Sequence, residues 1–354
     1  MDLQNFRTRI DEIDSQLVKL LDERASIARA VGETKAVGGL NTYDAGRQRG
    51  VLQKALEMSA GDIPRDGLAN VFREILSACL NLQKPLRVGY LGPPATFSHQ
   101  AAIREFGHSV RFESTQSIRE LFEMLDDGRV EHSVVPVENS TGGIIHDTLD
   151  AFLDSQAMIC AEILMPIEQS LVGVGTLERV RTVYSHRQGL MQCAEWLRAN
   201  LPDADLQEVA STARAMEMVA TNRNAAAIGS RIGAEMYGLR VLAPAIEDMK
   251  DNTTRFLVLA KRDSRATGRD RTSLMFGVRD KPGALYRALQ QFSERDLNLT
   301  KIESRPSRKN AWEQIFFVDV EGHREDAPLA DTLRALEAEC PEVRVLGSYP
   351  REGA

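Results

Sequence analysis

Residues 133–143 read Ser-Val-Val-Pro-Val-Glu-Asn-Ser-Thr-Gly-Gly, a short apolar run that ends in polar residues and two glycines. The apolar part is typical of a buried strand, and a helical pattern follows at 144–153. The same order of strand and helix recurs on both sides of this stretch, over residues 86–262. Such alternation predicts largely parallel sheets, and its near-repetition in two halves predicts two α/β lobes around a cleft.

The region before this one, residues 1–84, has the apolar spacing of helices throughout. The first helix is expected to run from Leu3 to about Val37, where Gly38 and Gly39 end the pattern. At 1.5 Å per residue it would be about 50 Å long, which is too long to bury its apolar stripe inside so small a monomer. We therefore expect an all-helical domain that forms an intertwined homodimer or a higher homo-oligomer.

The last segment, residues 271–350, follows a polar, basic linker. Its patterns come in the order strand, helix, strand, strand, helix, strand, which is the ferredoxin-like βαββαβ arrangement. The sequence thus predicts a multidomain protein with three different architectures.

The composition narrows the function classes. The 354 residues are 43% hydrophobic and 27% charged, as in folded chains of two or three domains. A net charge of -7 argues against broad nucleic-acid binding, and no apolar run is long enough to cross a bilayer. The N-terminus has no apolar secretion signal, and the four cysteines have neither CxxC nor zinc spacing. We expect a cytoplasmic protein that needs no metal or cofactor and binds neither nucleic acid nor membrane.

Basic residues on the first helix indicate a candidate site for a small dianion. On an ideal helix Arg24 and Lys35 point only about 20° apart and lie about 16 Å apart along the axis. Their spacing alone favours an ordinary solvated basic face, and the anion site is the alternative. Arg7 lies about 25 Å from Arg24 along the axis, so it can join such a site only from a second chain.

The first domain resembles the all-helical class of chorismate mutases, through FRTRIDEID, LLDERASIARAVGETK, YDAGRQRGVL and FREILSACLNLQ. The resemblance implies a rearrangement of chorismate to prephenate that needs positioning and charge stabilisation but no nucleophile. In this family Lys35 and Gln83 would be the catalytic donors to the ether oxygen, and arginines would bind the carboxylates. The matching pocket positions are Arg7, Arg24, Lys35, Asp44, Arg47, Gln48 and Gln83. Gln48 and Cys79 replace the glutamate and serine of many relatives, and we expect altered affinity or pH dependence there.

Four strand-to-helix junctions of the middle region open a helix with Ser, Thr or Asn, and they end at Ser98, Gly143, Gln188 and Ala213. Ordinary N-capping explains any one of them. Four such helix starts around two lobes favour a site for a small carboxylated ligand, because helix N-termini attract anions and such loops meet beyond the strand ends.

These loops, with Asn252-Thr-Thr-Arg-Phe256, resemble prephenate dehydratases over the whole middle region. The resemblance implies a two-lobed α/β fold like that of periplasmic binding proteins, and a reaction in which prephenate loses water and carbon dioxide to give phenylpyruvate. Thr254 is the expected catalytic residue, either as the acid for the leaving hydroxide or only as the group that orients it. Arg255 is expected to anchor a carboxylate, and Glu138 to order its loop. The expected pocket residues are Asn139, Ser140, Thr141, Ser185, Gln192, Thr212, Arg255 and Phe256.

The last segment resembles the ACT domain, a small-molecule sensor, through Lys281-Pro-Gly-Ala-Leu-Tyr286 and Glu303-Ser-Arg-Pro306. On the sequence alone a simple glycine turn explains the first motif equally well. The resemblance implies phenylalanine as an allosteric inhibitor, bound between two subunits. The residues assigned to it are Gly283, Ala284, Leu285, Asn298, Glu303 and Ser304.

The three resemblances together predict a bifunctional isomerase and lyase of phenylalanine biosynthesis. Two alternatives stay open. An enzyme that prefers arogenate would give phenylalanine directly, and no residue decides between the two substrates. A non-catalytic binder of aromatic metabolites is disfavoured by the intact sets around Thr254 and Arg24. Dimer and tetramer are not distinguished.

Overall fold

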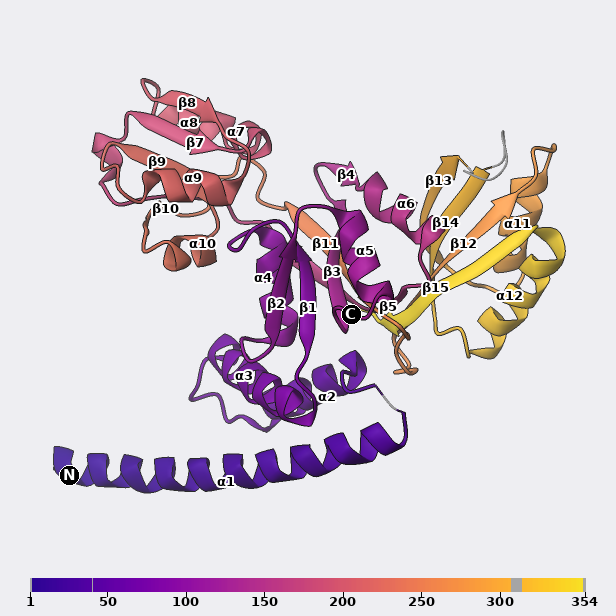
Figure 1. Cartoon of the computed structure of the whole chain (residues 1–354), viewed down its shortest axis with the longest axis horizontal. Helices are drawn as coiled ribbons and strands as arrows, with labels where there is room; N and C mark the ends of the chain where they lie inside the picture. Colours follow the sequence, from indigo (N-terminus) through magenta and orange to yellow (C-terminus); the bar gives the residue numbers. More distant parts are fainter. Residues whose placement is uncertain (1, 40, 307–313, 353–354) are drawn as a thin grey trace. The chain divides into compact units, whose positions relative to one another are not determined.

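A computed structural model describes residues 2–39, 41–306 and 314–352. It divides into two compact units, one of Met1–Val88 with Phe106–Phe112 and the other of Gly89–Glu105 with Glu113–Ala354 (Figure 1). In the described part of the chain, no helix combines the length and the apolar character that a membrane span requires.

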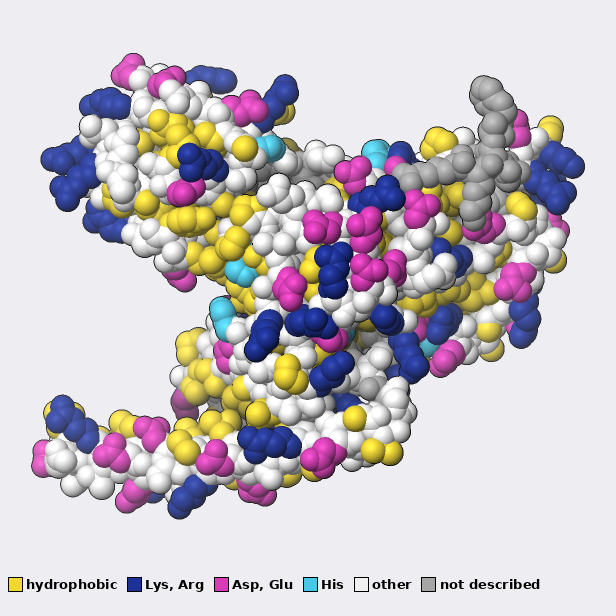
Figure 2. Space-filling view, in the orientation of Figure 1, with side chains coloured by type: hydrophobic (Ala, Val, Ile, Leu, Met, Phe, Trp, Pro, Cys, Tyr) yellow, Lys and Arg dark blue, Asp and Glu magenta, His cyan; other side chains and the backbone are white. Residues whose placement is uncertain are grey.

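The first unit is built on three helices, α1 (Leu3–Val37), α2 (Ala45–Met58) and α3 (Arg65–Gln83), as the sequence predicted. A Cβ on Gly32 of α1 would lie 2.7 Å from the Cα of Gln83, so glycine permits the close approach of α1 and α3. The buried residues of α1 are Ala28 and Gly32. Phe6 and Ile10 are 51% and 56% exposed, and Figure 2 shows hydrophobic side chains among charged ones along α1.

The first lobe, most of which lies in the second unit, is a sheet in the order β2-β1-β3-β11-β5, with β4 paired to β3. Its elements are β1 (Arg87–Leu91), α4 (Phe97–Phe106), β2 (Arg111–Thr115), α5 (Ile118–Asp126), β3 (His132–Asn139), β4 (Gly143–Ile144), α6 (His146–Asp154), β5 (Met158–Pro166) and β11 (Thr253–Ala260).

The second lobe is a five-stranded sheet in the order β10-β6-β9-β7-β8. Its elements are β6 (Ser170–Gly173), the 3₁₀ turn η1 (Leu177–Arg179), β7 (Thr182–Ser185), α7 (Arg187–Gln192), α8 (Ala194–Asn200), β8 (Asp205–Glu208), α9 (Thr212–Val219), β9 (Ala225–Gly229), α10 (Arg231–Met236) and β10 (Arg240–Ala243).

The two α/β lobes are confirmed, but the prediction of largely parallel sheets is wrong. Strand β7 is parallel to β8 and β9, whereas β6 is antiparallel to both β9 and β10. In the first lobe, β11 is antiparallel to both β3 and β5. The chain leaves this lobe after β5 and returns only as β11, which enters between two strands that run the other way. Alternating patterns along the sequence do not reveal such a return.

The C-terminal part has the predicted βαββαβ order, with β12 (Asp270–Val278), α11 (Ala284–Ser293), β13 (Leu299–Pro306), β14 (Gln314–Glu321), α12 (Ala327–Glu339) and β15 (Glu342–Pro350). The sheet order is β13-β14-β12-β15. On one face, Phe276 and Val318 pack with Phe292 of α11 and Leu336 of α12.

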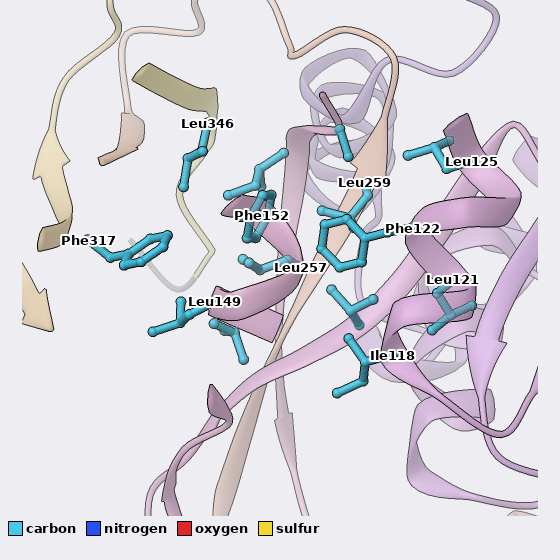
Figure 3. Close-up of a cluster of buried hydrophobic side chains, with 14 of the residues drawn as sticks. Ile118, Leu121, Phe122, Leu125, Leu149, Phe152, Leu257, Leu259, Phe317 and Leu346 are labelled. Atoms are coloured by element: carbon cyan, nitrogen blue, oxygen red, sulfur yellow. The ribbon is translucent and has the colours of Figure 1, made fainter. Parts of the chain in front are cut away.

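The opposite face of this sheet packs on the first lobe. Phe317 and Leu346 join a buried cluster with Phe152 of α6 and Leu257 of β11 (Figure 3). Gly347 of β15 has a φ of +151°, and a Cβ there would lie 2.2 Å from the carbonyl oxygen of Ile159 on β5. The C-terminal sheet is therefore in close contact with the lobe that carries Thr254.

Candidate active sites

Asn139 and Thr254 meet at the ends of two paired strands. Strand β3 ends at Asn139, which is in register with Thr254 on β11. The Nδ2 of Asn139 donates to the Oγ1 of Thr254 at 2.8 Å and to the Oδ1 of Asn252 at 2.7 Å. Thr254 is 8% exposed, so its hydroxyl lies in a largely desolvated place.

The loop after β3 fixes the orientation of the Asn139 amide. Its Oδ1 accepts hydrogen bonds from the backbone N–H of Gly142 at 2.7 Å and from the Oγ1 of Thr141 at 2.7 Å. The amide nitrogen must therefore face Thr254. Ser140 binds β11 as well, because its Oγ accepts from the N–H of Thr253 at 2.9 Å. Since Thr254 accepts from Asn139, its own proton is available to a ligand.

The second lobe contributes residues at neighbouring strand ends. Ser185 ends β7 and is 1% exposed, and Thr212 opens α9 after β8, the parallel neighbour of β7. The carboxyl ends of parallel neighbours meet at one edge of a sheet, as the sequence predicted for these junctions. Gln192 ends α7, and its Oε1 accepts from the Nε2 of Gln169 at 3.1 Å.

Arg255 does not belong to the group around Thr254, although we expected it to bind substrate there. Neighbouring residues of a strand point to opposite faces, and the Arg255 guanidinium is committed on the far face. Its Nε lies 2.9 Å from Glu162, its Nη1 2.5 Å from Asp319, and its Nη2 donates to the hydroxyl of Tyr349 at 2.8 Å. Burial disfavours a charged Asp319, yet Arg255 and a hydrogen bond from Ser273 hold its pKa below the usual value.

The helical unit brings together part of the expected mutase set. The Nη1 of Arg24 donates to the Sγ of Cys79 at 2.6 Å, and the Nζ of Lys35 donates to the carbonyl of Thr42 at 2.7 Å. Asp44 caps α2, since its Oδ1 accepts from the N–H of Arg47 at 2.9 Å, and Gln48 follows in the first turn of that helix. These contacts fix the chain around Arg24 and Lys35.

Two other residues of the expected mutase set are Gln83, which is partly buried, and Arg7, which lies far from the rest of the set. The Oε1 of Gln83 is buried without a hydrogen-bond partner in the described part of the chain, which indicates that a ligand completes this place. Arg7 is exposed on α1, about 25 Å from Arg24 along the helix, so one chain does not bring the two together.

Three family models match consecutive parts of the chain. Chorismate mutase type II matches residues 6–84, prephenate dehydratase residues 88–264, and the ACT domain residues 272–338. A bifunctional chorismate mutase/prephenate dehydratase of Aquifex aeolicus is 45% identical over 355 residues, which are 99% of this chain and 98% of the relative. One of Stutzerimonas stutzeri is 40% identical over 356 residues, with 99% and 98% coverage. This chain belongs to the bifunctional chorismate mutase/prephenate dehydratases. It is an enzyme, an isomerase and a lyase, as predicted.

A solved structure supports the fold of the second unit. The prephenate dehydratase of Arthrobacter aurescens in complex with L-Phe is 33% identical, with a TM-score of 0.70, and the match covers 75% of this chain and 90% of that one. Together with the family models for chorismate mutase and the ACT domain, this match confirms the three predicted architectures.

In the ACT domain, the residues assigned to phenylalanine lie in two places. Gly283, with a φ of +79°, is the N-cap of α11, which Ala284 and Leu285 open, and Glu303 and Ser304 lie near the end of β13. Val278 of β12 and Pro306 of β13 both pair with Gln314, so Gly283 follows this end of the sheet. Asn298 precedes β13 and therefore lies at the opposite end.

The sequence analysis did not assign Asn252 to the site. Its Oδ1 accepts a hydrogen bond from the Nδ2 of Asn139 and so helps to orient that amide. Its place directly before Thr253 and Thr254 was the available signal. Two histidines near the junctions have structural roles: His99 stacks on Tyr90 at 4.5 Å, and His186 caps α7. Among the described residues, no three His, Cys, Asp or Glu side chains gather as metal ligands do.

Proposed function

We propose that this enzyme converts chorismate to prephenate in its helical domain and prephenate to phenylpyruvate in its dehydratase domain, and that phenylalanine inhibits the second step. We place the three domains at residues 1–84, 86–262 and 271–350, and we expect the protein to be cytoplasmic. The observation that carries the dehydratase assignment is the hydrogen bond from Asn139 to Thr254, which leaves the threonine proton for the substrate.

In the dehydratase reaction, Thr254 donates a hydrogen bond to the ring hydroxyl as its C–O bond breaks. The electron pair of the bond to the ring carboxylate moves into the ring and expels the hydroxyl group, so that carbon dioxide and hydroxide leave and the ring becomes aromatic. The hydroxide then takes a proton from solvent to give water. A hydroxyl is a weak acid, and aromatisation supplies most of the driving force, so orientation by Thr254 is enough. The residues that line this pocket are Asn139, Ser140, Thr141, Ser185, Gln192, Thr212 and Phe256. Side chains of the second lobe, Ser185, Gln192 and Thr212, hold the carboxylates, because the side-chain donors of Asn139, Ser140 and Thr141 are engaged within the first lobe.

In the mutase reaction, Arg24 binds a carboxylate, and Lys35 and Gln83 donate to the ether oxygen, where negative charge develops in the transition state. The Oε1 of Gln83 is buried and has no hydrogen-bond partner among the described residues, so this oxygen can accept from a ligand hydroxyl while the Nε2 of the same amide donates to the ether oxygen. Asp44, Arg47 and Gln48 border this pocket from α2.

The mutase site is completed by Arg7 of a second chain. The apolar side chains of α1 are largely exposed, including Leu17 at 51% and Leu20 at 62%. A continuous exposed stripe on a helix of 35 residues is costly unless a partner covers it. A second copy that packs along α1 covers the stripe and brings its own Arg7 close to Arg24.

Phenylalanine binds between two ACT domains. Gly283 and Asn298 lie at opposite ends of one sheet, so a site that uses both takes one from each subunit. The related structure from Arthrobacter aurescens was solved in complex with L-Phe, which supports this ligand.

The test is purified enzyme supplied with chorismate alone, followed by product analysis with and without phenylalanine. We expect prephenate first and then phenylpyruvate, with phenylpyruvate formation suppressed by phenylalanine. Accumulation of prephenate would disprove the dehydratase assignment, and unchanged chorismate the mutase assignment. Parallel assays with arogenate decide the substrate, since a higher kcat/KM for arogenate than for prephenate would contradict our choice.

A further inference from the structure

Four charged side chains, those of Arg255, Glu138, Lys301 and Asp319, form a square next to the Thr254–Asn139 pair. Arg255 and Glu138 are the chain neighbours of Thr254 and Asn139, and they are in register across β11 and β3. On the ACT sheet, Asp319 of β14 and Lys301 of β13 are in register with each other. Each sheet thus presents one positive and one negative side chain as a cross-strand pair.

Two ion pairs join the sheets across this square. The Nη1 of Arg255 lies 2.5 Å from the Oδ2 of Asp319, and both side chains are less than 10% exposed. The Nζ of Lys301 lies 2.8 Å from the Oε2 of Glu138, with side-chain exposures of 14% and 39%. Every member has an opposite charge both beside it and across from it, so a shift of one sheet disturbs both pairs.

The surroundings strengthen the Arg255–Asp319 pair. Arg255 is also bound by Glu162 and Tyr349, and Asp319 accepts from the Oγ of Ser273. The buried apolar cluster of Figure 3, with Phe317 and Leu257, borders this place, and the low polarity strengthens the contact between Arg255 and Asp319. A cavity of about 30 Å³ lies among Arg255, Asp319 and Lys301, which is room for one water molecule.

We infer that Arg255 and Glu138 are positioning residues that hold Thr254 and Asn139 in hydrogen-bonding register, and that Lys301 and Asp319 place this register under the control of the ACT domain. The inference rests on the proposed dehydratase function. Lys301 lies on the same strand as Glu303 and Ser304, two of the residues assigned to phenylalanine, so a ligand that moves β13 moves the ammonium that holds Glu138.

The test compares Lys301→Met with Arg305→Met in the full-length enzyme. Arg305 is a matched control, because it lies on the same strand and makes an ion pair with Asp150 of the dehydratase domain, at 2.7 and 2.8 Å, away from the catalytic pair. We expect Lys301→Met to lower the dehydratase kcat about tenfold, equivalent to about 1.4 kcal/mol of transition-state stabilisation, with KM unchanged within about twofold. Arg305→Met should keep the wild-type kcat.

Two further variants separate positioning from a general structural role. Lys301→Arg should restore kcat, because it restores the charge on Glu138. Glu138→Gln combined with Lys301→Met should be no slower than either single variant, since both break the same contact. Equal losses in Lys301→Met and Arg305→Met, or additive losses in the double variant, would overturn the inference. If wild-type enzyme does not consume prephenate, the proposed function fails instead.

Discussion

The side-chain amide of Asn139 donates to the hydroxyl oxygen of Thr254 over 2.8 Å, while its carbonyl oxygen accepts from the loop that follows it. The direction of this one hydrogen bond decides where the Thr254 proton points. With an N–H donor at its oxygen, Thr254 is left to donate elsewhere.

Replacement of Asn139 by aspartate reverses this direction. A carboxylate still accepts from Gly142 and Thr141, but it also accepts the Thr254 proton, which then points away from the substrate. We expect Asn139→Asp to lower the dehydratase kcat about 100-fold, the low end of what one proton-transfer group contributes. Prephenate consumption measures this, and the mutase activity of the same protein is the control. An unchanged kcat would show that the hydrogen bond does not direct the proton.

A mixture of two inactive variants tests the shared mutase site. Arg7→Ala and Arg24→Ala homodimers should each lose mutase activity, because each site combines Arg24 of one chain with Arg7 of the other chain. After the chains are unfolded and refolded together, half of the dimers are mixed and have one intact site. Mutase activity should then return to about a quarter of the wild-type value. No recovery in the mixture would contradict a site that uses both chains.

Gly347 should be required for the contact between the ACT sheet and β5. In Gly347→Ala the new Cβ meets the Ile159 carbonyl, and the positive φ adds strain, so we expect a loss of about 1–3 kcal/mol. Gly277→Ala on β12 is the control, since its nearest neighbour lies at 3.8 Å. Thermal unfolding of both variants measures the difference. Equal melting temperatures would disprove the close approach.

The buried thiol of Cys193 should make stability fall in alkaline solution. Burial, together with Asp248 and Glu247, raises its pKa to about 12, from an ordinary value of 9.0. Above pH 9 the unfolded chain loses this proton and the folded chain keeps it, so stability falls with rising pH until about pH 12. Between pH 8 and 10.5 the stability advantage of wild type over Cys193→Ala should shrink by about 2 kcal/mol. A constant difference in denaturant unfolding would contradict the shift.

Local patterns predicted much of this molecule. The bounds of α1, the two lobes and the βαββαβ order follow from periodicity and from turn residues, which act over a few positions. The direction of β11 could not be predicted in this way, because β3 and β5 lie more than 80 residues before it in the chain.

Arg255 illustrates the limit for site residues. Its partners Glu162, Asp319 and Tyr349 are 93, 64 and 94 positions away, and no local pattern indicates them. A weaker signal was present, since strand alternation places Arg255 on the face opposite Thr254. Asn139 and Thr254 could be assigned to one site only because the motifs that contain them both resemble those of prephenate dehydratases.

The late return of β11 has a consequence for biosynthesis. A ribosome makes the whole second lobe before it makes Thr254, so the strand that completes the first sheet is missing until most of the polypeptide has emerged. Until then β3 and β5 lack their common neighbour, and they present open edges in the nascent protein. Completion of this sheet is therefore a late, long-range step of folding, and a translation product that ends before Thr254 cannot dehydrate prephenate.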